Sequence, residues 1–255
     1  MKVRAKKHLG QHFLKDTSIA QRTADWIDTT SVQAWLEVGP GMGVLTQYLL
    51  PKDIKFKAIE LDRESVDYLE RTVVGLQVVS GDFLKHDITQ LFESEFGVIG
   101  NFPYNISSQI LFKILDHVDR IPAFCGMFQL EVARRIAAEP NNKTYGILSV
   151  LIQAFYETKL EFEIPPTVFN PPPKVMSGVL SGRRIEQEID WNVPLFFDVV
   201  KTAFQQRRKT VANALKKFNL EKDQVLSNHL FKLRAENLTV QDFKDLTEFV
   251  ERYRS

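Results

Sequence analysis

The chain has 255 residues, of which 44% are hydrophobic and 25% are charged, and its formal net charge at neutral pH is +1. This composition excludes a disordered chain, and the length suffices for one large hydrophobic core and a small additional domain. The single cysteine, Cys125, excludes an intramolecular disulfide, and the sequence has neither an apolar run of membrane-spanning length nor a secretory segment. We therefore expect a cytoplasmic protein that does not enter a membrane.

The positive charges cluster in two places. Residues 1–15 contain five Lys and Arg and no carboxylate, and residues 199–220 contain six Lys and Arg and no carboxylate. Two basic patches on a nearly neutral protein are typical of a protein that binds a polyanion at defined points, although each patch alone also fits ordinary solvated charge. We predict that the contacts to a polyanion come from Lys6, Lys7, Arg207, Arg208, Lys209 and Lys216.

A glycine turn connects the first predicted strand, residues 34–38, to helical spacing over residues 44–49. Such a unit opens nucleotide-binding α/β sheets, where N–H groups of the turn approach the ligand. Gly43 comes one residue earlier than the dinucleotide fingerprint requires, and a proline in the turn and the preceding Glu37 oppose a pyrophosphate. The cationic S-adenosylmethionine has no phosphate and benefits from a negative neighbour, so we predict that it binds at Gly39 and Gly41.

Three more apolar segments, residues 56–59, 76–80 and 97–100, predict further strands whose carboxyl ends meet at the ligand-binding edge of the sheet. Glu60 follows the first segment about twenty residues after the glycine turn, where such sites place an acid that accepts from ribose hydroxyls. Asp82 follows the second segment. We predict that it accepts from the amino group of the cofactor's adenine, although Gly-Asp is also a common turn.

The third segment leads into Asn101-Phe102-Pro103-Tyr104. The Asn101 amide oxygen and the Pro103 carbonyl provide two acceptors that would position an exocyclic amino group and stabilise positive charge developing on its nitrogen during methylation. Tyr104 would stack on the base, which contributes about 1–3 kcal/mol. Asn and Pro are frequent in ordinary turns, so these residues alone do not decide. The neighbouring motifs favour a catalytic loop.

Three prolines at residues 171–173 predict an extended, rigid segment directly after Phe169 and Asn170. We predict that this segment holds the Phe169 ring as a second face of a base sandwich with Tyr104. A proline-rich linker, or a peptide that binds another protein, is the alternative interpretation of this composition.

The remaining periodic segments predict helices over residues 106–115 and 131–136 and strands over residues 124–128 and 147–155. Asp16 is predicted to cap a helix. No glycine follows Gly182, and apolar residues from Phe196 to Phe218 recur at helical spacing, with Arg207 unexplained among them. We predict two domains: residues 1–182, which contain the nucleotide-binding sheet, and residues 183–255, which form a small all-helical domain.

Eight segments, in this order, resemble the ribosomal RNA adenine dimethyltransferases, the KsgA family. The glycine turn alone would indicate only a methyltransferase, whereas the full set is specific and covers nearly the whole chain. The resemblance implies a Rossmann-like class I methyltransferase sheet followed by a helical RNA-binding domain. The matching segments are Leu9–Leu14, Leu36–Gly43, Glu60–Asp62, Gly81–Leu84, Asn101–Tyr104, Phe169–Val175, Gln206–Lys209 and Arg234–Leu238.

This resemblance implies transfer of methyl groups from S-adenosylmethionine to N6 of two adjacent adenosines in the 3′-terminal hairpin of small-subunit rRNA, two on each, during ribosome biogenesis. Phe102 replaces the usual Leu, without consequence for the acceptors beside it, and Ser177-Gly178 stands where the family commonly has Ser-Ala. The cofactor contacts implied by the resemblance are His12, Leu14, Gly39, Glu60, Asp82 and Asn101.

Three other functions remain open at this stage. The first is methylation of an adenine in large-subunit rRNA by a related resistance methyltransferase, and the second is a ribosome-assembly factor without catalysis. The third is methylation of a small molecule. The basic segments around Arg208 and Arg234 favour the small-subunit enzyme, and the intact Asn101 opposes the non-catalytic factor. We expect a monomer that binds small-subunit rRNA in the immature 30S subunit, without a metal site.

Overall fold

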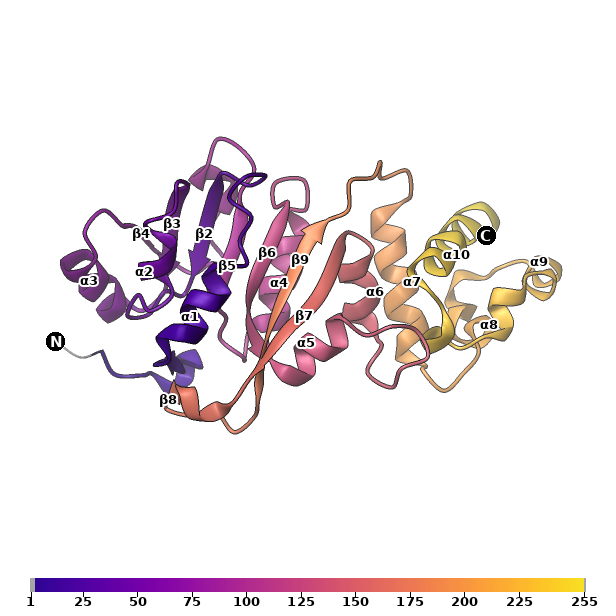
Figure 1. The fold of residues 1–255 in the computed structure, drawn as a ribbon. Helices are drawn as coiled ribbons and strands as arrows, with labels where there is room; N and C mark the ends of the chain where they lie inside the picture. The colour runs from indigo at the N-terminus through magenta and orange to yellow at the C-terminus, as the bar shows by residue number, and fades with distance from the viewer. Residues whose placement is uncertain (1–2, 255) are drawn as a thin grey trace. The chain divides into compact units, whose positions relative to one another are not determined.

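The computed structural model of the chain describes residues 3–254. It contains a seven-stranded sheet in the order β4-β3-β2-β5-β6-β9-β7 (Figure 1). The first five of these strands pair in parallel, and β9 is antiparallel to both neighbours. This topology confirms the predicted Rossmann-like sheet. The strands are Ala34–Val38 (β2), Lys55–Glu60 (β3), Gln77–Ser80 (β4), Gly97–Asn101 (β5), Ala123–Gln129 (β6), Tyr156–Ile164 (β7) and Ser177–Arg184 (β9).

A second, two-stranded sheet joins distant parts of the sequence. Strand β1, Phe13–Leu14, pairs antiparallel with β8, Phe169–Asn170, which follows the short 3-10 helix η3, Pro166–Val168. This pairing fixes the N-terminal segment against the proline-rich segment. The sequence predicted both segments but not their pairing.

Helices flank the larger sheet in the order expected for a doubly wound fold. Asp16 caps α1 as predicted, because its carboxylate accepts from the main-chain N–H groups of Ser18 and Ile19. The predicted helices near residues 106–115 and 131–136 are confirmed as α4 and α5. The helices are Thr17–Ala24 (α1), Thr46–Leu49 (α2), Arg63–Thr72 (α3), Ser107–Asp116 (α4) and Leu130–Ile136 (α5), with 3-10 helices Lys7–Leu9 (η1) and Ile88–Leu91 (η2).

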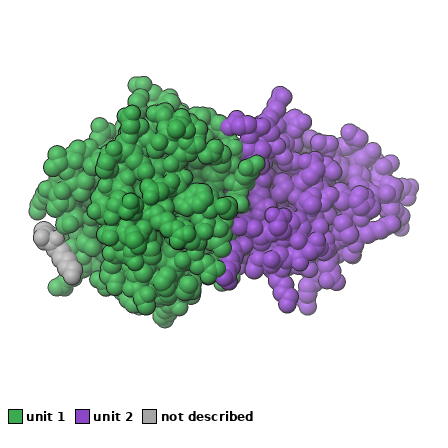
Figure 2. Space-filling view, in the orientation of Figure 1, with its two compact units in different colours: residues 1–133, 156–184 green, residues 134–155, 185–255 purple. Residues whose placement is uncertain are grey.

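The chain divides into two compact units (Figure 2). Unit 1 contains residues 1–133 and 156–184, and unit 2 contains residues 134–155 and 185–255. The described part of unit 2 beyond α5 is built from Ile147–Gln153 (α6), Val193–Gln205 (α7), Val211–Ala214 (α8), Leu215–Phe218 (η4), Lys222–Ser227 (α9), His229–Lys232 (η5), Ala235–Asn237 (η6) and Val240–Tyr253 (α10).

Unit 2 differs from the predicted C-terminal domain, which began at residue 183. Residues 134–155 belong to it because they pack with its helices: the Tyr145 and Phe204 rings meet edge to face at 6.1 Å, and the Asn141 N–H donates to the Glu236 carbonyl at 2.8 Å. The apolar repeat from Phe196 to Phe218 is also not one helix, because α7 ends at Gln205 and α8 begins at Val211.

The predicted strand over residues 147–155 is wrong, because Ile147–Gln153 forms the helix α6. Five consecutive residues from Leu148 to Ile152 are buried, so a continuous apolar run marks burial on all sides rather than a strand. The helix start is fixed by Ser149, whose hydroxyl accepts from the Gly146 N–H at 2.9 Å and donates to the Arg135 carbonyl at 2.5 Å.

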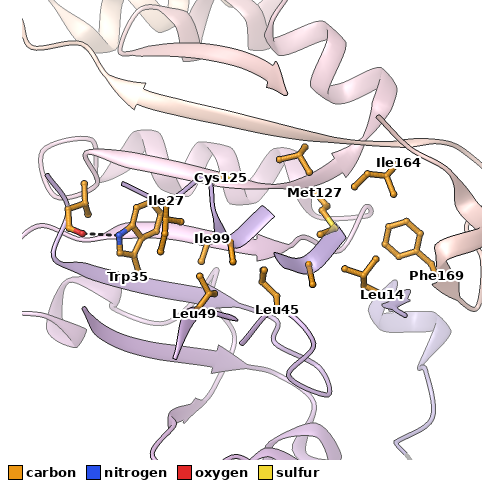
Figure 3. Packing of buried hydrophobic residues seen from close by; sticks show 14 residues of the cluster. Leu14, Ile27, Trp35, Leu45, Leu49, Ile99, Cys125, Met127, Ile164 and Phe169 are labelled. Carbon is orange, nitrogen blue, oxygen red and sulfur yellow. Dashed lines mark hydrogen bonds between the residues drawn. The ribbon is translucent and has the colours of Figure 1, made fainter. Parts of the chain in front are cut away.

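One buried hydrophobic cluster of unit 1 joins residues of the sheet to residues of α1 and α2 (Figure 3). Trp35 of β2 is 2% exposed, and its indole N–H donates to the Val32 carbonyl at 3.0 Å. Gly97 of β5 makes room for this ring, because a Cβ there would lie 2.5 Å from it. Burial of such large apolar side chains is the main stabilising contribution to the fold. The other members of the cluster are Leu14, Ala20, Ala24, Ile27, Val32, Leu45, Leu49, Ile99, Cys125, Met127, Ile164, Phe169 and Val179.

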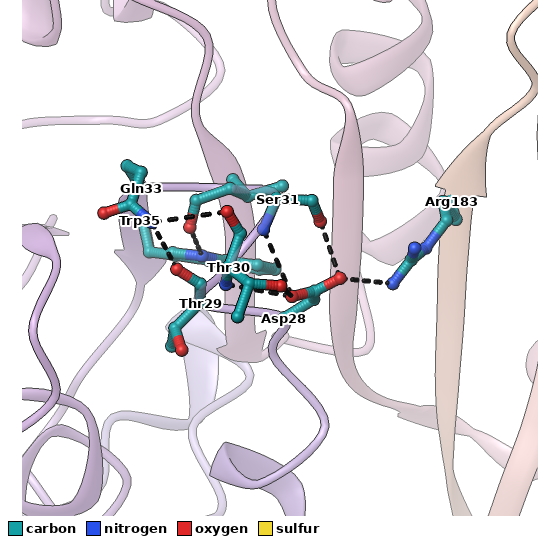
Figure 4. Close-up of polar contacts among 8 residues, drawn as sticks. Asp28, Thr29, Thr30, Ser31, Gln33, Trp35 and Arg183 are labelled. Atoms are coloured by element: carbon teal, nitrogen blue, oxygen red, sulfur yellow. Dashed lines mark hydrogen bonds and ion pairs between the residues drawn. The ribbon is translucent and has the colours of Figure 1, made fainter.

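A polar network ties the turn before β2 to the antiparallel strand β9 (Figure 4). The Asp28 carboxylate accepts from the main-chain N–H groups and hydroxyls of Thr30 and Ser31, and the Arg183 guanidinium donates to it at 2.8 Å. The hydroxyls of Ser31 and Thr30 lower the pKa of Asp28 well below its usual range. No helix among residues 3–254 is long and apolar enough to cross a membrane.

Candidate active site

A cavity lies at the carboxyl ends of the parallel strands of unit 1, and residues 9–13 also line it. A smaller cavity shares Phe13, Gly39, Gly41 and Asn101 with it and is also lined by Leu14 and Glu37. Most of the predicted cofactor and catalytic residues of unit 1 therefore meet at one place. Those lining the larger cavity are His12, Gly39, Gly41, Glu60, Asp82, Asn101, Pro103 and Tyr104.

The glycine turn adopts a backbone conformation that side chains disfavour. Gly39, Gly41 and Gly43 have φ of 69°, 59° and 78°, in the left-handed region. At Gly41, a Cβ would also lie 2.8 Å from the Phe13 ring. The turn can therefore bring its backbone close to both the N-terminal segment and a ligand.

Glu60, the last residue of β3, accepts a hydrogen bond from this turn. Its carboxylate is 5% exposed and accepts from the Gly41 N–H at 3.0 Å and the Asp62 N–H at 2.8 Å. Burial raises the pKa of Glu60, while these two N–H donors act in the opposite direction. Each carboxylate oxygen retains acceptor capacity, so Glu60 fits the predicted role of accepting from ribose hydroxyls.

Glu37 does not provide the negative charge that the sequence suggested. The side chain is 1% exposed, and its carboxyl group accepts from the Thr46 hydroxyl at 2.7 Å. Burial raises the pKa of Glu37 to about 8. The group is therefore mainly protonated at neutral pH, and its role at the edge of the smaller cavity is that of a neutral polar group.

Asp82 lies in the turn after β4 and lines the larger cavity. One carboxylate oxygen accepts from the Leu84 N–H at 2.9 Å, and Lys85 lies 3.8 Å from the other. The structure thus shows both features considered from the sequence, a turn residue and an acceptor at the cavity.

The orientation of the Asn101 amide is set by the N-terminal segment. Its Nδ2 donates to the His12 carbonyl at 2.9 Å, which leaves the amide oxygen as an acceptor. The Pro103 carbonyl accepts from the Ile106 N–H at 3.2 Å and keeps a second lone pair. Two acceptors thus come from one short loop that lines the cavity.

Tyr104 is held at its hydroxyl and on one ring face. The hydroxyl hydrogen-bonds to the Ser177 hydroxyl at the start of β9. The His12 ring stacks on Tyr104 with 5.6 Å between centroids and 28° between planes. Burial raises the pKa of Tyr104, so its hydroxyl stays protonated at neutral pH.

The structure does not bring Phe169 to Tyr104 as a second face for the base. Phe169 is 1% exposed and packs in the unit 1 core beside Leu14, its partner in the β1–β8 pair (Figure 3). Its ring belongs to the hydrophobic cluster rather than to the lining of the larger cavity. In the β1–β8 pair the Phe169 side chain is buried against Leu14, and the proline pattern alone did not predict this burial.

The predicted polyanion contacts fall into two groups. Lys6 and Arg207 are engaged within the protein: Lys6 Nζ lies 2.5 Å from Asp62 and 3.3 Å from Glu64, and Arg207 donates to Glu236 at 2.7 Å and to the Lys143 carbonyl at 2.8 Å. These partners explain the arginine within the apolar repeat. The exposed cations are Lys7, Arg208, Lys209 and Lys216.

Three residues at the site were missed as participants. Ser177 was noted only as part of a departure from the family pattern, although it anchors Tyr104. Asp62 and Gln11 lay within family segments, and they bond to each other at 3.3 Å. A helix-start signal was present at Asp62, which precedes α3 and caps it. Among residues 3–254, no group of three or more His, Cys, Asp or Glu side chains is arranged to hold a metal.

The sequence as a whole matches proteins of a known family. A family model described as ribosomal RNA adenine dimethylase matches residues 2–252. Ribosomal RNA small subunit methyltransferase A of Flavobacterium johnsoniae is 53% identical, covering 98% of this chain and 97% of the relative. The protein of the same name from Cytophaga hutchinsonii is 50% identical, covering 98% of each chain.

Two solved structures have the same fold as this chain. A dimethyladenosine transferase from Plasmodium falciparum superposes with a TM-score of 0.79 at 26% identity, covering 94% of this chain and 98% of that one. The 23S rRNA methyltransferase ErmE has a TM-score of 0.73 at 22% identity, with 94% and 99% covered, and shows a shared fold. The chain therefore belongs to the ribosomal RNA adenine dimethylase family.

Proposed function

We propose that this protein is an S-adenosylmethionine-dependent dimethyltransferase that modifies N6 of two adjacent adenosines in the 3′-terminal hairpin loop of small-subunit rRNA. The proposal rests on the orientation of Asn101, whose Nδ2 donates to the His12 carbonyl, which leaves its oxygen as an acceptor for a substrate. The names of the relatives at 53% and 50% identity support the small subunit as the source of the substrate.

The acceptor pair addresses the main chemical difficulty of the reaction. The exocyclic nitrogen of adenine is a weak nucleophile because its lone pair is delocalised into the ring. Hydrogen bonds from the amino group to Asn101 Oδ1 and the Pro103 carbonyl would fix the nitrogen and stabilise the positive charge that develops on it. Tyr104 would stack on the extruded base, an interaction worth about 1–3 kcal/mol.

The cavity residues fit S-adenosylmethionine. The buried Glu60 carboxylate has acceptor capacity for ribose hydroxyls, Asp82 for an adenine amino group, and the glycine turn permits close approach of a ligand to the backbone. His12 and Leu14 would contact the cofactor from the N-terminal side. When bound, S-adenosylmethionine supplies an electrophilic methyl group on a sulfonium, and S-adenosylhomocysteine is the leaving group.

We further propose that the protein acts as a monomer in the cytoplasm, on the immature 30S subunit. The exposed cations Lys7, Arg208, Lys209 and Lys216 would contact RNA phosphates without reading sequence. Choice of the two adenosines then falls to the fit of the hairpin and to the acceptors at the cavity.

The substrate is tested by incubating the purified protein and labelled S-adenosylmethionine with immature small subunits and, separately, with naked large-subunit rRNA. We expect label in N6,N6-dimethyladenosine of small-subunit rRNA only. Label only in large-subunit rRNA would assign the protein to the large-subunit class. Binding of small subunits without label in either RNA would support a non-catalytic assembly factor.

A further inference from the structure

Asp62 is a buried carboxylate that the proposed methyl transfer does not use. It lies two residues after Glu60, is 3% exposed, and caps α3 by accepting from the Glu64 N–H at 3.2 Å. The Ser65 hydroxyl of α3 donates to Oδ2 at 3.2 Å. Two further partners come from the N-terminal segment: Lys6 Nζ is 2.5 Å from Oδ1, and Gln11 Nε2 donates to Oδ2 at 3.3 Å. Removing the cation that pairs with a buried carboxylate strongly destabilises the folded protein. These contacts therefore attach the N-terminal segment firmly at Asp62.

Residues 6–12, here called the N-terminal strap, form a closed loop above this attachment point. The Lys6 N–H donates to Gln11 Oε1 at 2.8 Å, and the Leu9 N–H donates to the Lys6 carbonyl at 3.0 Å. Gly10 has φ of 66°, which permits the reversal of the chain. Lys6 and Gln11, which lie near the two ends of the strap, both donate to Asp62, so this one carboxylate holds the strap near both ends.

The strap also touches residues 101–105 at the end of β5, here called the acceptor loop. The His12 carbonyl accepts from Asn101 Nδ2 at 2.9 Å, and a Cβ at Gly10 would lie 2.3 Å from Asn105 Oδ1. Displacement of the strap therefore removes the acceptor that selects the orientation of Asn101. A rotated amide would present N–H donors to an amino group that is itself a donor.

We infer that Asp62 is a positioning residue for methyl transfer, which holds the strap through Lys6 and Gln11 so that the His12 carbonyl keeps the Asn101 oxygen directed at the target amino group. The inference rests on the proposed function, since the orientation of Asn101 matters only if that amino group binds there. It also assigns Lys6 to the strap instead of to RNA. The pKa of Asp62 is consistent with this pairing: burial raises it, but hydrogen bonds from Lys6 and Gln11 lower it overall.

The test compares kcat and KM for RNA among Asp62→Asn, Lys6→Met and the double variant, each with Asn101 intact and with Asn101→Ala. Asparagine caps helices as well as aspartate, so Asp62→Asn removes the charge and retains an acceptor for the start of α3. The matched control is Lys55→Met, which removes an exposed lysine at the opposite end of β3.

We expect either single variant to lower kcat about tenfold and to leave KM for RNA within about twofold, because the substitutions act on the transition state rather than on RNA binding. The double variant should be no slower than the slower single one, since both break the same attachment. Neither substitution should slow the Asn101→Ala enzyme further. Lys55→Met should match the unmodified protein.

Several results would overturn the inference. Additive losses, or a raised KM for RNA in Lys6→Met that grows with salt, would return Lys6 to RNA binding. A lower Tm for Asp62→Asn with unchanged kcat would make the residue structural only. If Asn101→Ala has normal kcat, the proposed function of the acceptor loop fails. If Asn101→Ala is slow but Asp62→Asn is not, only the positioning role fails.

Discussion

The cavity of unit 1 and the exposed cations of unit 2 serve the proposed reaction by different physics. In unit 1, Glu37, Glu60 and Asp62 are 1%, 5% and 3% exposed, and each is held by hydrogen bonds at low local dielectric. In unit 2, Arg208 and Lys209 are exposed, and their proposed action on RNA phosphates is through a field that salt screens. This difference implies that the proposed methyl transfer depends on the position of single groups, whereas the proposed RNA affinity depends on summed charge.

The largest difference between catalysis and RNA binding is expected for a substitution of Asn101. We expect Asn101→Ala to lower kcat about 100-fold, the size seen when one preorganised hydrogen-bonding group at a transition state is removed. Affinity for RNA, measured by titration without cofactor, should change by no more than about twofold because the exposed cations are intact. An unaltered methylation rate would refute the role of the acceptor loop.

The burial of the Glu37 carboxyl group in unit 1 can be tested through the pH dependence of the unfolding free energy. Burial raises the pKa of Glu37 to about 8 from 4.5, so the folded state binds a proton that the unfolded state releases, and stability falls as pH rises between these values. Between pH 6 and pH 8 the unmodified protein should lose about 2 kcal/mol of unfolding free energy relative to Glu37→Gln, at about 1.4 kcal/mol per fully coupled pH unit. Urea unfolding at both pH values measures this, and parallel pH profiles would contradict it.

Tyr104 tests whether the base meets an aromatic face at the cavity. Tyr104→Ala should lower kcat/KM about tenfold, since base stacking contributes about 1–3 kcal/mol. Tyr104→Phe is the matched control, because it keeps the ring and loses only the hydrogen bond to Ser177, and it should have a smaller effect. Equal activity of the alanine variant and the unmodified protein would exclude stacking on this residue.

The smallest effect is expected in unit 2. Arg208→Glu should weaken RNA binding about fivefold at low salt and less at physiological salt, with kcat at saturating RNA unchanged. Lys222→Glu, an equal charge reversal at an exposed site outside the basic patches, is the control. An affinity that does not respond to salt in the unmodified protein would contradict the account of these cations.

The parallel half of the sheet was predictable because β2, β5 and β6 are almost entirely buried and because several strands end at chemically distinctive residues. Residues 34–38 run into the glycine turn, and β3 runs into Glu60. By contrast, β7 mixes exposed and buried residues without a continuous apolar run, so its place beside β9 gave no local signal. The prediction for α6 was wrong for the opposite reason, because the five central residues of this helix are all buried and no polar face reveals the helical period.

At the site, residue types were predictable but long-range pairings were not. The acceptors of Asn101 and Pro103 and the carboxylate of Glu60 follow from what strand ends do in such sheets. The burial of Phe169 depends on pairing with Leu14, and the engagement of Lys6 depends on Asp62. Both pairings join residues more than fifty positions apart, a separation at which periodicity carries no information.

The most direct measurement of the central claim is a crystal structure of the protein with S-adenosylmethionine and an RNA hairpin that contains the target adenosines. The account predicts that Asn101 Oδ1 and the Pro103 carbonyl lie about 3 Å from the extruded N6 atom, with Asn101 Nδ2 still on the His12 carbonyl. The reactive methyl group should face that nitrogen. A cofactor methyl directed away from Asn101, or an amide nitrogen turned toward the base, would contradict it.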